Sequence, residues 1–219
     1  MAKGLSKEQI ARRAARELRD GMYVNLGIGL PNLIPEYLGG VEVVIHSENG
    51  LLGMGPLARG ADEDPDIVNA AKQPVHMVAG AAVCSQCDSF AIIRGGHLDM
   101  TVLGAFQVSA RGDLANWQVP GDRVPGVGGA MDLVTGTKCV MVTMTHTAPD
   151  GSAKIVEECT YPLTGRRCVN LVVTDLAFLR VTDAGLVLEE VAPGVTAEEV
   201  RAVTGARLLV SPTLKEMAV

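Results

Sequence analysis

Residues 47–50 read Ser-Glu-Asn-Gly and place a carboxylate at the end of a strand-like segment, residues 41–45, which closes on the apolar residues Val43, Val44 and Ile45. Ligands of open α/β sheets gather at the carboxyl ends of strands, so this glutamate, Glu48, is a candidate nucleophile. Residues 51–56 are too apolar for a solvated loop, and we expect an apolar loop that forms a wall or lid and partly desolvates the carboxylate. The alternative for a glutamate beside an Asn-Gly turn is an ordinary solvated surface position.

Two glycine-rich turns could bring the backbone close to a ligand. Gly27 and Gly29 follow the strand-like residues 23–26, but the third glycine and the acidic ribose ligand of a dinucleotide-binding turn are absent. This turn is either a tight strand-to-helix connection or a place where a bulky ligand approaches the backbone. Gly128 and Gly129 stand just before a predicted helix, where backbone N–H groups can stabilise developing negative charge; a plain connector is the alternative.

Histidine and lysine side chains are weaker candidates for chemistry. His97 and Asp99 form the most tempting His/Asp pair, yet no serine or cysteine nucleophile elbow accompanies them, so hydrogen bonding to local backbone is expected for His97. His46 and His146 receive the same interpretation. Lys72 is predicted at the end of a short helix, where the helix dipole favours a lysine and a surface role is the default.

The five cysteines are odd in number, and the N-terminal residues predict a charged helix in place of a secretion signal, which favours free thiols. Cys84 and Cys87 have the spacing of half a zinc site or of a redox pair, but no second Cys/His pair with suitable spacing follows. We therefore expect no metal, and we expect the cysteines to be buried and inert.

Composition limits the class of protein. The 219 residues are 47% apolar and 20% charged, with 25 glycines, which together predict a sizeable core and many tight turns. A net charge of −6 argues against nucleic-acid binding. No apolar run approaches the roughly 20 residues of a membrane-spanning helix. We expect a cytoplasmic protein that forms one domain over residues 1–219.

The predicted elements alternate along the chain. A capping box at Ser6 and Gln9 begins the first helix, and Pro31 suits the first turn of a second helix. Hairpins are predicted at residues 106–117 and 179–191. Strands alternating with short helices predict an α/β fold with a largely parallel sheet flanked by helices. The remaining predicted strands are residues 75–78, 100–103, 139–143, 169–173 and 207–210, and the remaining predicted helices are residues 66–72, 130–134 and 197–204.

Six segments that occur in one order form the most specific signature of the sequence. Together they resemble the B (β) subunit of the 3-oxoacid CoA-transferases, the family that includes acetoacetate and 3-oxoadipate enzymes. The resemblance covers about residues 5–211 and implies an open mixed α/β sheet like that of sugar-phosphate isomerases. The segments are residues 24–31, 47–56, 94–99, 112–117, 128–133 and 160–165.

The resemblance also implies an activity, a substrate and a partner. CoA would pass from an acyl-CoA donor, such as succinyl-CoA, to a 3-oxoacid, with coenzyme A as substrate and no permanently bound cofactor. Glu48 would form a glutamyl-CoA thioester in an α₂β₂ enzyme completed by an A subunit. Gly128 and Gly129 match the oxyanion loop of the family, and Lys72 matches a lysine near the CoA phosphates. Roles in CoA binding are also expected for Asn25, Gly27, Gly29 and Asn49.

Two other functions remain open on such a fold. A non-catalytic ligand sensor would not need the carboxylate, and a sugar-phosphate isomerase would need a phosphate cradle and an isolated base. The acid that receives CoA is also open. A second carboxylate, as in 3-oxoadipate, requires a cation in the acyl pocket, for which Arg111 and Arg123 are candidates unless the A subunit supplies it.

Overall fold

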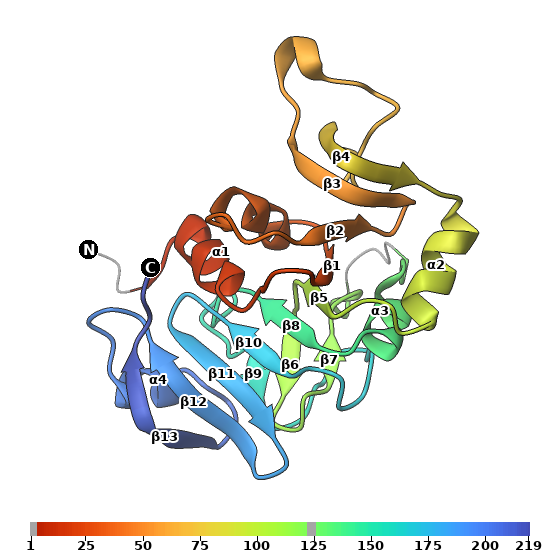
Figure 1. Ribbon diagram of the computed structural model, residues 1–219. Coiled ribbons are helices and arrows are strands. Elements are labelled where there is room, and N and C mark those ends of the chain that lie inside the picture. Colours follow the sequence, from red (N-terminus) through yellow and green to blue (C-terminus); the bar gives the residue numbers. More distant parts are fainter. Residues whose placement is uncertain (1–3, 122–125) are drawn as a thin grey trace.

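Ten strands form the main sheet of the computed structural model, which describes residues 4–121 and 126–219 (Figure 1). They are β1 (Tyr23–Leu26), β2 (Val44–Ser47), β3 (Leu51–Leu57), β4 (Val75–Val83), β5 (Met100–Leu103), β8 (Val140–Thr143), β10 (Leu171–Val173), β11 (Ala177–Thr182), β12 (Gly185–Val191) and β13 (Leu208–Glu216). Their order across the sheet is β13-β12-β11-β10-β8-β5-β1-β2-β3-β4.

The five central strands, β10, β8, β5, β1 and β2, run parallel, and the next strand on each side, β11 or β3, is antiparallel. All residues of β5, β8 and β10 are buried. Their apolar runs fit this position, because a strand covered on both faces needs apolar side chains on both. The predicted α/β fold with an open mixed sheet is confirmed.

Short helices flank the sheet. In α1 (Lys7–Ala15) the predicted capping box is present, with Ser6 and Gln9 satisfying each other's backbone N–H groups. η1 (Leu30–Tyr37) is a 3₁₀ helix with Pro31 in its first turn, as predicted. The described part of the chain holds no helix with the length and apolar character that crossing a bilayer requires. The other helices are η2 (Gly60–Asp62), α2 (Gln86–Arg94), α3 (Ala130–Gly136) and α4 (Ala197–Ala202).

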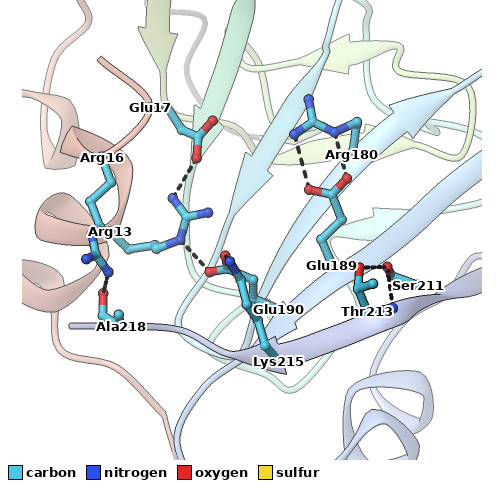
Figure 2. Close-up of polar contacts among 10 residues, drawn as sticks. All are labelled: Arg13, Arg16, Glu17, Arg180, Glu189, Glu190, Ser211, Thr213, Lys215 and Ala218. Atoms are coloured by element: carbon cyan, nitrogen blue, oxygen red, sulfur yellow. Dashed lines mark hydrogen bonds and ion pairs between the residues drawn. The ribbon is translucent and has the colours of Figure 1, made fainter. Parts of the chain in front are cut away.

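A buried arginine ties α1 to the sheet (Figure 2). Arg13 is 4% exposed and donates from Nε to Glu190 of β12 at 2.6 Å and from Nη1 to Glu17 at 2.8 Å. Lys215 of β13 approaches the other oxygen of Glu190 at 3.3 Å. Because Glu190 is also buried, the loss of its partner Arg13 would leave a carboxylate in the interior with only the more distant Lys215.

Strands β3 and β4 form a hairpin that stands out from the body of the protein (Figure 1). The prediction of a loop at residues 51–56 is therefore wrong. Gly53 has a φ of +86°, and an added Cβ would lie 2.9 Å from Ala81, so only glycine fits there. The pairing also shifts register on either side of Met54, which removes the strict alternation of a regular strand.

The two predicted hairpins are confirmed. β6 (Gln107–Ser109) pairs with β7 (Leu114–Ala115) in a small second sheet, which β9 (Ile155–Val156) completes. In the main sheet, β11 and β12 pair antiparallel up to Thr182 and Gly185, on either side of the predicted turn.

The predicted helix at residues 66–72 is wrong. This segment forms a turn, in which Asn69 Oδ1 accepts hydrogen bonds from the backbone N–H groups of Ala71 at 2.9 Å and Gln73 at 3.0 Å. Lys72 has a φ of +62°, which lies outside the right-handed helical region. Asparagine favours such turns because its side chain competes for backbone N–H groups. The helix-dipole argument for Lys72 is therefore wrong as well.

Candidate active site

A cavity of about 470 Å³ opens at the carboxyl ends of the parallel strands. Leu26, Leu103 and Thr143 are the last residues of β1, β5 and β8, and all three line it. Glu48 also lines the cavity and directly follows Ser47, the last residue of β2. Glu48 thus lies at a strand end, where open α/β sheets bind their ligands.

Three influences act on the half-buried carboxylate of Glu48. Burial raises the pKa of Glu48 above its ordinary value, a hydrogen bond from the Gly129 backbone N–H lowers it, and Asp132 raises it. A Cβ on Gly129 would lie 2.5 Å from Glu48 Oε2, so any other residue there would push the carboxylate out of its present position. Gly128 has a φ of +61° and lines the cavity next to it. The structure therefore brings this glycine pair to Glu48.

A chain of buried side chains holds the backbone of Glu48. The Ser89 hydroxyl of α2 donates to the Glu48 carbonyl oxygen at 2.8 Å and meets His46 Nε2 at 2.9 Å. His46 Nδ1 in turn meets Asn25 Nδ2 at 3.1 Å. Since the Ser89 proton is donated to Glu48, the network assigns the proton of His46 to Nε2, and Nδ1 accepts from Asn25.

Burial keeps His46 neutral, because it lowers the pKa of the ring to about 4. A neutral ring suits the network, since a protonated ring could not accept a hydrogen bond at Nδ1. Asn25 is 1% exposed and also accepts a hydrogen bond from the Thr101 hydroxyl at 3.2 Å. Its side chain does not line the cavity. The structure therefore places Asn25 behind Glu48 and outside the cavity in which coenzyme A is expected.

The turn after β1 contributes one of its two glycines to the cavity. Gly27 lines it, and a Cβ there would lie 2.9 Å from Leu103, so the packing of β1 against β5 requires a glycine. Gly29, with a φ of +93°, does not line the cavity, and an added Cβ would meet nothing within 4 Å. Gly27 thus makes a tight strand-end turn that also faces the cavity, while Gly29 serves the backbone turn.

Asn49 and Ser47 tie a neighbouring turn to the end of β2. Asn49 Nδ2 donates to the Val68 carbonyl at 2.7 Å, and Ser47 Oγ accepts from the Ala70 N–H at 3.0 Å. Ala70 lines the cavity, whereas Lys72 is exposed and does not. The two predicted CoA-binding residues of this region, Asn49 and Lys72, therefore lie next to the cavity wall and outside the cavity itself.

Lys154 is a cavity residue that sequence reasoning missed. It is half-buried, and burial lowers its pKa from the ordinary lysine value. Arg111, a predicted cation of the acyl pocket, does not line this cavity, and Arg123 lies outside the described residues. No local signal marks Lys154, because it precedes β9, a strand of only two residues, in a segment without a motif.

The described residues hold no candidate metal centre, since no three His, Cys, Asp or Glu side chains come close enough to share an ion. All five cysteines are free thiols, as expected. The prediction that they are buried is wrong for Cys87, which is exposed in α2, and the other four are only partly buried. Burial raises the pKa of Cys159 to about 12 and that of Cys168 to about 11, which makes these two thiols unreactive.

Comparison with known proteins confirms the resemblance noted in the sequence. The Coenzyme A transferase family model matches residues 7–202. The B subunit of 3-oxoadipate CoA-transferase from Pseudomonas putida is 50% identical over 210 residues, which are 95% of this chain and 99% of that relative. The beta subunit of acetate CoA-transferase from Escherichia coli K12 is 51% identical over 210 residues, which are 95% of this chain and 96% of that relative.

A solved structure of an acyl-CoA transferase apoenzyme from Escherichia coli O157:H7 has the same fold, with a TM-score of 0.78 at 22% identity. The match covers 98% of this chain and 43% of that one, so this chain spans less than half the length of that relative. The family, however, follows from the sequence matches. With residues 7–202 matched by the family model and half of its residues identical to two CoA-transferase subunits, the chain belongs to the coenzyme A transferase family.

Proposed function

We propose that this chain is the catalytic B-type subunit of a two-subunit CoA-transferase and that Glu48 is its nucleophile. The observation that carries the proposal is the close approach of the Gly129 backbone to the Glu48 carboxylate, in a cavity at the strand ends. The two relatives are named as the B and beta subunits of their enzymes, which supports a separate A subunit. We propose that the two chains form an α₂β₂ assembly. We place this protein in the cytoplasm as a single domain.

The reaction begins when the Glu48 carboxylate attacks the carbonyl carbon of the donor thioester. The C–S bond breaks, CoA leaves as a thiolate, and Glu48 and the acyl group are joined as a mixed anhydride. The thiolate then attacks the Glu48 carbonyl carbon, which releases the donor acid as a carboxylate and leaves a glutamyl-CoA thioester. The acceptor carboxylate repeats these steps in reverse, so atoms and charge balance over the cycle.

The Gly129 N–H is positioned for the charge that develops during these steps. In the resting enzyme it lies close to the Glu48 carboxylate and lowers the pKa of that group. When Glu48 carries an acyl or thioester group, the same N–H can donate to the oxygen that becomes negative in the tetrahedral intermediate. One donor of this kind contributes about 3 kcal/mol to the stability of the transition state.

Burial favours the nucleophile in two ways. The raised pKa makes the Glu48 carboxylate more basic than a surface glutamate, and a carboxylate that is ionised at neutral pH needs no separate base. The cavity wall is largely apolar and includes Leu26, Leu30 and Leu103. Such a wall limits the water that would hydrolyse the anhydride and the thioester.

We propose that coenzyme A reaches Glu48 past the turn that contains Ala70. Lys72 lies two residues further along and is exposed, which fits a contact to a phosphate that stays in water. The glycine turn after β1 borders the same path through Gly27, which lines the cavity. Asn49 lies next to the path, because its side chain donates to the Val68 carbonyl in the turn that contains Ala70. No permanently bound cofactor is needed for this chemistry, because coenzyme A is a substrate.

We propose succinyl-CoA as the donor and a 3-oxoacid, acetoacetate or 3-oxoadipate, as the acceptor. The name of the Pseudomonas putida relative supports 3-oxoadipate, whereas the Escherichia coli relative is named for acetate. The ligand sensor and the sugar-phosphate isomerase are not favoured, since about half of the 210 aligned residues are identical to those of CoA-transferase subunits.

The test of Glu48 uses the chain assembled with its A subunit. The enzyme is incubated with acyl-CoA in the absence of an acceptor acid and then reduced with borohydride, which converts a Glu48 thioester to an alcohol that mass spectrometry can locate. We expect the modification on the Glu48 peptide of the wild type and none in Glu48→Gln. Modification of a peptide other than the one that contains Glu48, or full activity of Glu48→Ala, would refute the proposal.

A further inference from the structure

The cavity carries one cation and one carboxylate. Among its described lining residues, Glu48 is the only acid and Lys154 is the only cation. The two side chains form no ion pair with each other, and neither shifts the pKa of the other. Lys154 and Glu48 therefore line the same cavity without neutralising each other.

Lys154 lacks a counterion of its own. Within the described part of the chain, its ammonium group takes part in no ion pair. Burial lowers its pKa, and the charge of Asp175 offsets this only in part. Asp175 already accepts a hydrogen bond from the His146 N–H at 2.6 Å. A desolvated ammonium without a partner is costly, so the position suits an anion that arrives with the substrate.

The backbone of Lys154 is held on both sides. Its N–H donates to the His146 carbonyl at 3.3 Å, and its own carbonyl accepts from the Val108 N–H at 2.9 Å. These bonds connect the residue to the segment after β8 and to β6 of the small sheet. The ammonium group is thus presented from an ordered segment, as recognition of a substrate group requires.

Thr143, another residue that lines this cavity, has a hydroxyl group without a partner in the described part of the chain. It is the last residue of β8 and is 1% exposed. Its Oγ1 has no hydrogen-bond partner among the described residues. A buried hydroxyl without a partner is unfavourable, and an oxygen atom of a bound substrate would satisfy it.

We propose that Lys154 and Thr143 bind the distal carboxylate of a short dicarboxylic acyl group while Glu48 reacts at its other end. The inference rests on the proposed role of Glu48. A dicarboxylic acid joins one carboxyl group to CoA and keeps the other ionised, which matches a cavity with a nucleophile at one point and a cation at another. A monocarboxylic acid of the same length leaves Lys154 without a counterion.

Succinate and butyrate are matched acceptors for the test, since they have equal numbers of carbon atoms and differ in a terminal carboxylate or methyl group. The assembled enzyme is assayed with each acid and with acetyl-CoA as donor, and we expect the wild type to favour succinate. Lys154→Met should lower kcat/KM for succinate on the order of 100-fold and leave butyrate within about twofold. Lys154→Arg keeps the charge and should keep the preference for succinate.

Thr143→Val is a second variant with nearly the same shape, and it should reduce the preference for succinate in part. Equal losses for both acids in Lys154→Met would overturn the inference, as would a wild type that does not favour succinate. A higher KM for acetyl-CoA with an unchanged acid preference would assign Lys154 to coenzyme binding and also overturn it. Borohydride labelling separates this failure from that of Glu48: a labelled variant with unchanged preference refutes only the role of Lys154, and an unlabelled wild type refutes both.

Discussion

The carboxylate of Glu48 is shaped by contacts from several elements. Burial in the cavity raises its pKa, the Gly129 N–H before α3 lowers it, and Asp132 of α3 raises it. Ser89 of α2 holds the backbone of the same residue, and buried His46 of β2 orients Ser89. Glu48 is therefore more basic than a surface glutamate and is held at both its side-chain and its main-chain atoms.

Asp132 provides a test of this electrostatic arrangement. It pairs with Arg94 at 2.6 Å and raises the pKa of Glu48. Asp132→Asn removes a negative charge and leaves the cation of Arg94 unopposed, and both changes favour the ionised carboxylate. We expect the acid limb of the kcat/KM profile, which reports ionisation in the free enzyme, to move to lower pH.

The control for this profile is Asp99→Asn. Asp99 pairs with Lys138 at 2.8 Å, as Asp132 pairs with Arg94, but it does not act on the pKa of Glu48. The acid limb of the kcat/KM profile of Asp99→Asn should stay at the wild-type position. If the acid limb of Asp132→Asn stays at the wild-type pH or moves to higher pH, the assignment of that limb to Glu48 is contradicted.

Gly129→Ala tests the close approach of the backbone to the nucleophile. The new Cβ would lie 2.5 Å from Glu48 Oε2 and 2.9 Å from Phe90. The φ of Gly129 is −85°, so the backbone accepts alanine and the effect is steric. We expect kcat to fall by about 100-fold, since a shift of about 1 Å at a reacting group carries that loss.

Gly104→Ala is the matched control, measured by the same steady-state assay. Gly104 lines the same cavity, but an added Cβ meets nothing within 4 Å. Its activity should stay well above that of Gly129→Ala. Equal losses in the two variants would show that the spacing at Glu48 is not the cause.

Residues that depend on local sequence could be predicted, and residues that depend on strand order could not. Glu48 follows an apolar run and Gly129 precedes a helix, so each has a signal in its own segment. His46 and Ser89 lie 43 residues apart and meet only because α2 packs beside the end of β2. Lys154 has no signal of its own and reaches the cavity only through the pairing of β9 with β6.

At the scale of elements, the predictions failed where side chains or glycines override the usual patterns. Gly53 packs closely against β4, and a register shift at Met54 interrupts the alternation, so β3 resembles an apolar loop in sequence. Asn69 binds the backbone N–H groups that a helix would need. For α2 the sequence holds a signal in Ser85, whose side chain accepts from the Asp88 N–H as the N-cap, but this signal overlaps the spacing of the two neighbouring cysteines.

The attachment of α1 to the sheet gives a prediction about stability. Arg13→Met removes the partner of the buried Glu190 and leaves this carboxylate in the interior with only Lys215 nearby. We expect the free energy of unfolding to fall by about 3 kcal/mol, as for one partner lost from a buried ion pair. Urea unfolding of the isolated chain measures the change.

Arg180→Met is the matched control, because both Arg13 and Arg180 lie over the ring of Phe178. Arg180 pairs with Glu189 at 2.7 Å (Figure 2). Both members of this pair are partly exposed, so its loss should lower the free energy of unfolding by less than about 1 kcal/mol. If Arg13→Met costs no more than Arg180→Met, the buried pair does not hold α1 in place.

At the scale of the whole molecule, the parallel centre of the sheet assembles the site. Parallel strands end at one edge, so β1, β2, β5 and β8 bring their last residues, or the residues just beyond, to a single cavity. The turn before α3 closes over this edge and supplies Gly129 to Glu48. The candidate site thus lies where the parallel strands converge, while the antiparallel strands extend the sheet away from it.

The same buried centre couples the stability of the protein to pH. Burial lowers the pKa of His46 and of His146 to about 4, from an ordinary value of 6.5. Between these values the unfolded chain binds a proton at each ring and the folded protein does not. The free energy of unfolding should therefore fall as the pH falls from 6.5 to 4, by about 3 kcal/mol for each histidine.

Urea unfolding across this pH window measures the effect, and His146→Gln provides the comparison. His146 is held by the hydroxyls of Thr174 and Thr204, each at 2.9 Å, so the variant is expected to be less stable at neutral pH but to lose about half of the pH dependence.

Glu48 acts on the pH dependence in the opposite sense, since its raised pKa lets the folded state keep a proton, but one carboxyl group does not cancel two histidines. Asp99, whose pKa is lowered by Lys138 from 3.8, loses its contribution below the window. A flat wild-type profile would mean that the rings are protonated in the folded state, and His46 could then not accept the hydrogen bond of Asn25 behind Glu48.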